Sequence, residues 1–400
     1  MRKKLLADRV VGLSASATVT LPDKARELRT QGIDVIDLSE GQPHFDTPEP
    51  IKESAKQALD SGMVFYVESA GLPELRSEIK SKLERDNGID VPISQIIATV
   101  GAKQAIFTAI LCTIDPGDEV LIPDPYWGSH ASCVKIAGGI PISVPMRNEK
   151  DFSIDTEKIE EAITSKTKMM ILSSPHNPTG MVVSKSDLEF VADLCRRHEI
   201  IAMSDEIYEK IVYDGVRHYS IGSFPGMEDL TITINGFSKS YSMTGWRLGY
   251  VAASKEIISR MLVVQQHSVT HPSAFVQKAG IVALRDCDKY VEQMVRDYQR
   301  ARDFFVPELN KLEIFSCPMP KGAFYAFPRV KDTRTKSADL VESLLKKANL
   351  LAVPGSSFGK YGEGYVRFVY AQTMDVLKKT IDRLKMATGK PSDRSEQEVS

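Results

Sequence analysis

The amino-acid sequence predicts an α/β fold with a mostly parallel sheet covered by helices, together with a second, smaller α+β domain. Short apolar runs alternate with helical patterns between about residues 50 and 290, as in chains built from β–α–β units. After about residue 288, a long charged helical pattern is followed by shorter strand patterns. This change predicts that the smaller domain begins there.

In the larger domain, five apolar runs predict buried strands and three intervening segments predict helices. The strands are expected at 119–122, 168–172, 200–203, 231–234 and 248–252. The helices are expected at 102–114, 186–198 and 254–266. The second helix opens with Ser186 and has Glu189 three residues further on, a pattern typical of an N-terminal capping box.

The remaining segments predict a smaller domain and two terminal regions. A charged helix is expected over 289–311, strands over 323–328 and 364–370, and a final amphipathic helix from near Thr373. About the first 45 residues contain several prolines and glycines and are expected to be irregular, packing against the smaller domain. The predicted organisation is an N-terminal segment 1–48, a large domain 49–288, a small domain 289–388 and a flexible tail 389–400.

The composition is that of a soluble globular protein: the 400 residues carry a net charge of −2, with 42% hydrophobic and 26% charged residues. Without a basic excess, nucleic acid is not expected as a partner. A membrane is not expected either, because no apolar stretch approaches the ~20 residues of a spanning helix. Asp8 and Arg9 interrupt the N-terminal apolar run too early for a signal peptide. Five widely spaced cysteines, an odd number, favour free thiols and a cytoplasmic location.

Polar residues follow four apolar runs at the points where those runs end. Gly101, Asn177, Asp205 and Lys239 each come shortly after such a run. In open α/β sheets, ligands bind beyond the carboxyl ends of the strands. The sequence therefore predicts a binding site at this edge of the sheet.

Lys239 and Asp205 suggest the chemistry of pyridoxal 5'-phosphate (PLP). Lys239, framed by serines, is placed to form a Schiff base with the cofactor aldehyde, and its amine could then move a proton between substrate and cofactor. Asp205 would lie under the pyridine nitrogen and keep it protonated, so that the ring withdraws electrons. The alternatives are an ordinary loop lysine and a helix-capping aspartate.

A phosphate group has several candidate partners in the sequence. Arg247, eight residues after the lysine, would bind it through the planar guanidinium. The backbone amides of Gly101, Ala102 and Lys103 would receive it at a helix N-terminus, and Ser238 could add a hydroxyl. The alternative for Gly101 is a simple tight turn.

Four further residues complete the predicted site. Tyr208 could donate a hydrogen bond to the phenolic oxygen of the cofactor, and Asn177 could contact that oxygen from the other side. Trp127 could stack on the pyridine ring. Arg367 lies in the middle of an apolar strand pattern, where a lone arginine needs an anion such as a substrate α-carboxylate. The alternative roles are those of a core residue for Tyr208 and Trp127, of a turn residue for Asn177, and of a partner in a structural ion pair for Arg367.

These motifs together resemble the PLP-dependent aminotransferases of fold type I, in class I/II, and in particular the bacterial aspartate aminotransferase group. The resemblance covers nearly the whole chain, from about residue 38 to 367. The motifs that carry it are Asn177-Pro-Thr-Gly180, Ser204-Asp205-Glu-Ile-Tyr208, Ser238-Lys239, Met243-Thr-Gly-Trp-Arg247 and Gly322-Ala-Phe-Tyr325. The resemblance implies a seven-stranded sheet in the large domain and a ping-pong transfer of an amino group from an L-amino acid to a 2-oxo acid.

The resemblance also implies a homodimer whose active sites lie at the subunit interface. Tyr66 matches the tyrosine that reaches the phosphate of the neighbouring subunit, and Thr270 is expected near that site too. Gly41 matches a loop that closes over the substrate. Such closure would exclude water from the reacting carbon.

The amino donor is less clearly indicated. Lys103 matches a lysine that can bind the distal carboxylate of aspartate or glutamate in this group, with Ser16 and Thr18 as helpers; the alternative is a residue that serves only the phosphate. The chain departs from the group's usual pattern at Ser14, Gln42, His44, Gly128, His130 and His176. An aromatic or other specialised donor therefore stays open.

Other functions fit the sequence less well. A different PLP reaction on the same fold, such as that of a lyase, a decarboxylase or a synthase, is not excluded by the motifs. A PLP-binding regulator would need an added DNA-binding segment, and a nicotinamide-dependent dehydrogenase would need a GxGxxG motif opening a helix, which the sequence lacks. No metal is expected among the site residues.

Overall fold

The computed structural model describes residues 5–147 and 151–388. Its centre is a seven-stranded sheet with the strand order β2-β8-β7-β6-β5-β3-β4, in which β8 alone runs antiparallel to its neighbours. The strands are β2 (Ile96–Thr99), β3 (Glu119–Asp124), β4 (Ile140–Pro145), β5 (Thr167–Ser173), β6 (Ile201–Asp205), β7 (Thr231–Gly236) and β8 (Gly249–Ala252). The predicted α/β class and the mostly parallel seven-stranded sheet are thereby confirmed.

Helices cover both faces of this sheet because alternate strand residues point to opposite sides. On β3, Val120 and Ile122 pack with α4, α5 and α8, whereas Leu121 packs with α6 and α7. A third cluster joins α2, α3 and α9 to the β2–β8 edge. The helices are α2 (Glu49–Asp60), α3 (Pro73–Lys82), α4 (Gly101–Thr113), α5 (Ser129–Ala137), α6 (Thr156–Ala162), α7 (Lys185–His198), α8 (Lys255–Gln266) and α9 (Ala274–Asp286).

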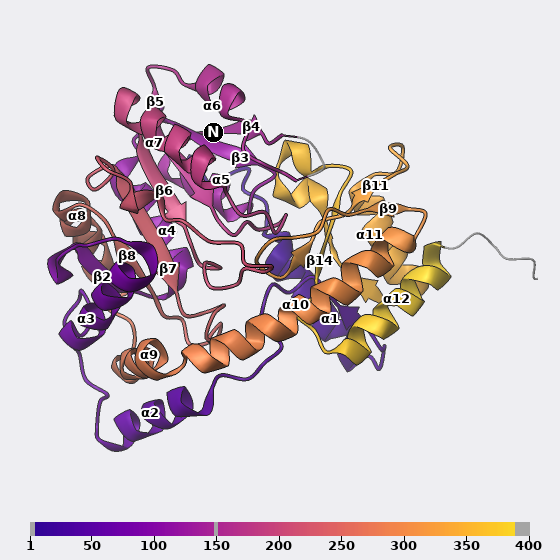
Figure 1. Ribbon diagram of the computed structural model, residues 1–400, viewed down its shortest axis with the longest axis horizontal. Helices are drawn as coiled ribbons and strands as arrows, with labels where there is room; N and C mark the ends of the chain where they lie inside the picture. The colour runs from indigo at the N-terminus through magenta and orange to yellow at the C-terminus, as the bar shows by residue number, and fades with distance from the viewer. Residues whose placement is uncertain (1–4, 148–150, 389–400) are drawn as a thin grey trace, which may run out of the picture.

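The long helix α10 (Asp288–Lys311) leads from the large sheet to a smaller group of elements with its own core, as Figure 1 shows. Its helices are α11 (Ser337–Ala348) and α12 (Met374–Thr388). Its short strands are β9 (Phe315–Ser316), β10 (Tyr325–Ala326), β11 (Arg329–Val330), β12 (Leu350–Leu351), β13 (Val353–Pro354) and β14 (Val366–Val369). The predicted tail 389–400 lies outside the described residues, and the predicted domain limits stay a prediction.

The N-terminal segment is more regular than predicted. It forms helix α1 (Ala17–Thr30), which contains Pro22, and strand β1 (Ile36–Asp37). Pro22, the sixth residue of this helix, has no amide hydrogen and so removes the bond that would run to the Thr18 carbonyl, yet the helix continues through it. Strand β1 pairs in parallel with β12, which attaches the N-terminal segment to the smaller core. The expectation of an irregular segment was therefore wrong, although the expected packing partner is the one observed.

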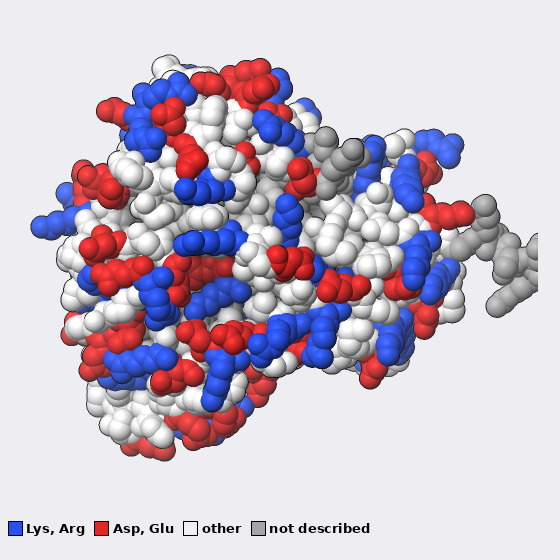
Figure 2. All heavy atoms as spheres, in the orientation of Figure 1, with Lys and Arg blue, Asp and Glu red and all other residues white. Residues whose placement is uncertain are grey.

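Short helical turns join the larger elements. They are η1 (Asp8–Val10), η2 (Leu83–Asn87), η3 (Ile93–Gln95), η4 (Ile221–Ser223), η5 (Gly355–Phe358) and η6 (Lys360–Gly362). In the described part of the chain, no helix combines the length and apolar character that crossing a membrane would require. On the face shown in Figure 2, basic and acidic side chains are interleaved over the surface.

The capping residue of α7 differs from the one predicted. Ser184, in extended conformation, accepts a hydrogen bond on its hydroxyl from the Asp187 amide at 3.1 Å, and the helix begins at Lys185. Ser186 already lies inside the first turn, so the capping box on Ser186 and Glu189 was wrong. Two serines two residues apart offer alternative starts, and the extended backbone at Ser184 makes that residue the cap.

We predict that Ser184→Ala lowers the free energy of unfolding by about 1 kcal/mol, because it leaves one amide of the first turn without its acceptor. Ser186→Ala is the matched control and is expected to change it by less than about 0.5 kcal/mol. Urea unfolding of both variants measures the difference. Equal losses in the two variants would contradict the assignment of Ser184 as the cap.

Candidate active site

A cavity of about 470 Å³ lies at the carboxyl ends of the parallel strands. Asp205 ends β6, while Asn177 and Lys239 lie in the loops that follow β5 and β7. The structure brings together most of the residues that the sequence predicted for the site, whereas Ser16, Tyr66, Gly101 and Thr270 do not line the cavity. Those that line the cavity are Gly41, Ala102, Lys103, Trp127, Asn177, Asp205, Tyr208, Ser238, Lys239, Arg247 and Arg367.

Lys239 is a buried amine in the cavity. Its Nζ donates a hydrogen bond to the Gly41 carbonyl at 2.5 Å and lies 6.0 Å from the centre of the Tyr208 ring. Burial is the main cause that lowers the pKa of Lys239 to about 7, and the positive charges of Arg367 and Arg247 lower it further. Near neutral pH, a large share of this amine is therefore the unprotonated nucleophile.

Asp205 is a buried carboxylate at the end of a central strand. Its Oδ1 accepts a hydrogen bond from the Ile207 amide at 3.3 Å, and its Oδ2 lies 3.4 Å from Nε2 of the buried His130. A turn follows, not a helix, so the helix-cap interpretation of Asp205 was wrong. His130 was noted in the sequence only as a departure from the family pattern, and its contact with Asp205 could not be read from spacing alone.

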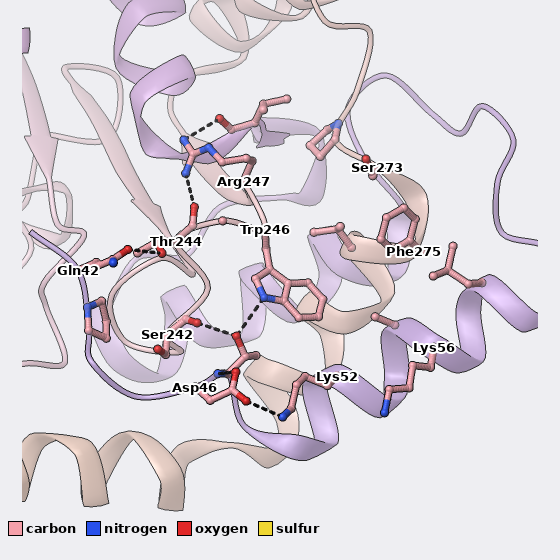
Figure 3. A pocket seen from close by; sticks show the side chains of 18 of the residues that line it. Gln42, Asp46, Lys52, Lys56, Ser242, Thr244, Trp246, Arg247, Ser273 and Phe275 are labelled. Atoms are coloured by element: carbon pink, nitrogen blue, oxygen red, sulfur yellow. Dashed lines mark hydrogen bonds and ion pairs between the residues drawn. The ribbon is translucent and has the colours of Figure 1, made fainter. Parts of the chain in front are cut away.

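Arg247 is held by backbone carbonyls of two segments. Its guanidinium donates to the carbonyl of Thr244 at 2.8 Å and to that of Val100 at 3.5 Å (Figure 3). The neighbouring Trp246 stabilises the loop that carries Arg247, because its indole N–H donates a hydrogen bond to the Thr47 hydroxyl at 3.0 Å. Arg247 has a φ of 57°, in the left-handed region that costs energy for a residue with a Cβ. These contacts fix the guanidinium between the cavity and a second, open hollow of about 980 Å³.

Gly101 does not line the cavity, but it makes room for Arg247. Gly101 has a φ of 75°, and a Cβ at this position would overlap the Arg247 guanidinium. A tight turn alone therefore does not explain Gly101: the Arg247 guanidinium lies so close to its Cα that only glycine fits at this position. Helix α4 begins at Gly101, so its first amides point toward the same region.

Arg367 is a buried cation held by a side-chain amide oxygen and a backbone carbonyl. It is 1% exposed on strand β14, donates to Asn177 Oδ1 at 3.0 Å and to the Ser39 carbonyl at 2.5 Å, and its Nε has no partner. Its guanidinium lies against two rings, 4.6 Å from the centre of Tyr325 and 5.0 Å from that of Phe358. No carboxylate of the described residues forms an ion pair with it, so the structural ion-pair interpretation was wrong.

Lys103 and Trp127 form one wall of the cavity. The Lys103 ammonium lies 4.9 Å from the centre of a Trp127 ring, a cation–π distance. Partial burial lowers the pKa of Lys103. Thr18 of α1 lines the same cavity, and Ser16 contacts the Thr18 hydroxyl at 2.9 Å. Lys103 thus points into the space where a ligand would lie.

The structure adds Tyr325, a residue to which the sequence assigned no role. Its hydroxyl lies 2.5 Å from the hydroxyl of Tyr208, and both side chains line the cavity. Burial raises the pKa of both tyrosines. In the sequence, the only indication that Tyr325 belongs to the site is its place in the Gly322-Ala-Phe-Tyr325 motif. Glu40 also lines the cavity and was not predicted.

The comparisons with known proteins agree with this geometry. Residues 33–384 match the family model described as aminotransferase class I and II. This chain belongs to the class I and II aminotransferases.

Relatives of this aminotransferase are named for two kinds of donor. It is 47% identical to an aspartate aminotransferase of Pyrococcus abyssi, over 88% of this chain and 91% of that one. It is 43% identical to an aromatic-amino-acid aminotransferase of Thermococcus litoralis, over 94% and 97%. A solved aspartate aminotransferase from Thermus thermophilus with maleate is 39% identical, with a TM-score of 0.92, covering 96% of this chain and all of that one.

Tyr66 does not line the cavity of this aminotransferase. Its side chain is 87% exposed and contacts the His271 ring edge-on, with 5.8 Å between ring centres. Thr270 lies beside it and adopts a φ of 65°. Within one chain, neither residue reaches the site around Lys239.

The cavity of this aminotransferase has more basic than acidic side chains. Four basic side chains line it, against the two carboxylates of Glu40 and Asp205; the basic ones are Lys103, Lys239, Arg247 and Arg367. The pKa of Glu40 is raised, mainly by burial, so this carboxylate balances less of the positive charge. A cavity with such an excess favours anionic ligands.

We predict that Lys239 reacts with small aldehydes at much lower pH than exposed lysines do, because burial favours its neutral form. In the ligand-free protein, the rate of reductive methylation at Lys239 should rise with a midpoint near pH 7. Exposed lysines, with an ordinary pKa of about 10.4, serve as internal controls. Peptide mass spectrometry across a pH series measures both. A Lys239 rate that still rises steeply above about pH 9, together with the controls, would contradict the lowered pKa.

Proposed function

We propose that this protein is a PLP-dependent aminotransferase that transfers an amino group from an L-amino acid, with aspartate or a similar donor favoured, to a 2-oxo acid such as 2-oxoglutarate. Transfer would follow a ping-pong scheme. The observation that carries the proposal is the buried Lys239 amine, with its pKa lowered to about 7, in a cavity with an excess of basic groups.

The cavity residues suit PLP. Arg247, the first amides of α4 and the Ser238 hydroxyl would hold the phosphate, and Asp205 would hold the pyridine nitrogen. Tyr208 and Asn177 would contact the phenolic oxygen, and Trp127 would cover the ring. When bound, PLP supplies an aldehyde that condenses with amines and a ring that withdraws electrons.

Lys239 is the proposed catalytic residue. Its neutral amine would first hold the cofactor, then be released by the incoming substrate amine, and then move the proton from the substrate Cα. A lowered pKa suits this role, because the amine must accept and return a proton near neutral pH.

Two cations would orient the substrate. Arg367 would bind the α-carboxylate, since its guanidinium is buried without a carboxylate partner among the described residues. Lys103 would bind the distal carboxylate of a dicarboxylic donor, with Thr18 beside it. Gly41 would close the site, because the same loop already contacts Lys239.

We further propose a cytoplasmic homodimer with shared active sites. The adjacent side chains of Val64, Phe65 and Tyr66 are 63%, 78% and 87% exposed, an unusual apolar stretch for a surface. From such a surface Tyr66 would reach the phosphate of the neighbouring subunit. The five unpaired cysteines support a reducing compartment.

The domain limits 1–48, 49–288 and 289–388 are part of the proposal. They are supported by the hydrophobic cluster that gathers the elements of the smaller part, together with residues 207–213, and by the β1–β12 pairing that attaches the N-terminal segment to it. The start of α10 at Asp288 marks the passage from one part to the other.

We predict that Lys239→Ala folds normally but loses the visible absorbance that borohydride reduction abolishes, because no amine is left to hold the PLP aldehyde. The rate of transamination should fall by roughly 10³-fold or more. Lys103→Ala, which removes another lysine of the same cavity, should keep the reducible band. A reducible band in purified Lys239→Ala would show that another lysine does this work.

We predict that aspartate is a better donor than tyrosine or phenylalanine in a panel run with 2-oxoglutarate, oxaloacetate and pyruvate. Lys103→Ala should lower kcat/KM for aspartate roughly 10- to 100-fold, the loss of one charge-assisted hydrogen bond, and leave alanine within about twofold. Aromatic rates equal to or above those for aspartate in the wild type would favour the aromatic aminotransferase instead. The apolar walls formed by Ile106, Trp127 and Ile207 are the observation that favours this second candidate.

A further inference from the structure

Tyr325 reaches the cavity from a different part of the chain than Tyr208 does. Tyr208 lies in the turn after β6 of the large sheet, while Tyr325 begins β10, which pairs with the Arg367 strand β14. The two hydroxyl oxygens are 2.5 Å apart, and both side chains are at least nine-tenths buried. This contact joins the large sheet to the smaller core at the floor of the cavity.

The Gly41 loop packs directly on the Tyr325 hydroxyl. A Cβ at Gly41 would lie only 2.5 Å from the Tyr325 oxygen, and the Gly41 carbonyl accepts the hydrogen bond from Lys239. The hydroxyl of Tyr325 therefore lies between Tyr208 and the loop that holds the catalytic lysine. Only a residue without a side chain at position 41 allows this arrangement.

The buried pair lies beside a positive charge. The Arg367 guanidinium is 4.6 Å from the centre of the Tyr325 ring, and its charge opposes the rise in pKa of both tyrosines. Burial raises the pKa of both tyrosines, but that of Tyr208 well above its usual value, with the neighbouring Tyr325 adding to the rise. Either hydroxyl can donate in this contact, and only the direction in which Tyr325 donates and Tyr208 accepts leaves the Tyr208 proton for a ligand in the cavity.

We propose that Tyr325 is a positioning residue whose hydroxyl donates to Tyr208 and thereby strengthens the hydrogen bond that Tyr208 gives to the phenolic oxygen of the cofactor. This inference rests on the proposed PLP function. A hydroxyl that accepts a hydrogen bond becomes a better donor, because the bonds in a chain polarise one another. Because the Tyr208 oxygen accepts the hydrogen bond from Tyr325, the hydroxyl hydrogen of Tyr208 is free to be donated to the ligand.

The other titratable and charged groups near the pair are Asp205, Lys239 and Arg367. None of them is a hydrogen-bond partner of the Tyr325 hydroxyl among the described residues, whose one such contact is with Tyr208. Removing the Tyr325 oxygen therefore changes one link and leaves the charges in place.

The test is the pH titration of the visible absorbance of the PLP-loaded enzyme. A donor to the phenolic oxygen stabilises its negative charge and so lowers the pH at which the bound chromophore loses its proton. In Tyr325→Phe, the weakened Tyr208 bond should raise this midpoint by roughly 0.3 to 1 pH unit. In a Tyr208→Phe background, adding Tyr325→Phe should produce no further shift, because the link has already been removed.

The matched control is Tyr370→Phe. Tyr370 is equally buried in the smaller core, and its hydroxyl contacts Tyr213 and the Ala323 carbonyl away from the cavity, so the midpoint should stay unchanged. A Tyr325→Phe midpoint equal to that of the wild type, a shift in Tyr370→Phe of the same size, or a full additional shift in the double variant would overturn the inference. If the wild type shows no reducible visible band at all, the proposed function itself fails, and the inference fails with it.

Discussion

The buried, unneutralised guanidinium of Arg367 is the constraint on which the rest of the site depends. Burying a cation is costly unless hydrogen bonds or an anion compensate it. Here Asn177, the Ser39 carbonyl and two aromatic rings compensate in part, and the Nε is left without a partner. Burial is the main cause of the lowered pKa of Lys239, and the remaining charge of Arg367 lowers it further and provides a place for a carboxylate.

The backbone arrangement makes this concentration of charge possible. Parallel strands bring the ends of β5, β6 and β7 to one edge, so residues far apart in the sequence meet there. Two positions without a side chain allow the closest approaches. Gly101 makes room for Arg247, and Gly41 makes room for the Tyr325 hydroxyl. The N-terminal segment reaches the cavity because β1 pairs with β12 and the Leu38 carbonyl accepts a hydrogen bond at 2.9 Å from the Val369 amide of β14, the strand that carries Arg367.

Local patterns in the sequence predicted most of the large sheet and the residues at its carboxyl edge. Apolar strands between amphipathic helices have a clear periodicity, and polar residues at their ends stand out. Prediction failed where two local signals compete. Ser184 and Ser186 are both acceptable caps, and the backbone conformation selects the first. Helix α1 was missed because Pro22 suggests a break, whereas the helix continues through this proline with the loss of one backbone hydrogen bond.

The sequence by itself determined the fold class, the family and the set of chemically competent residues, because these depend on residue type, order and spacing. Only the tertiary structure decided what each residue contacts. Among the described residues it gave Arg367 no carboxylate partner, and it placed His130 beside Asp205 and Tyr325 against Tyr208. It also left Tyr66 outside the cavity of its own chain. Such contacts join residues far apart in the sequence, as in the two tyrosines, whose residue numbers differ by 117, and no local pattern predicts them.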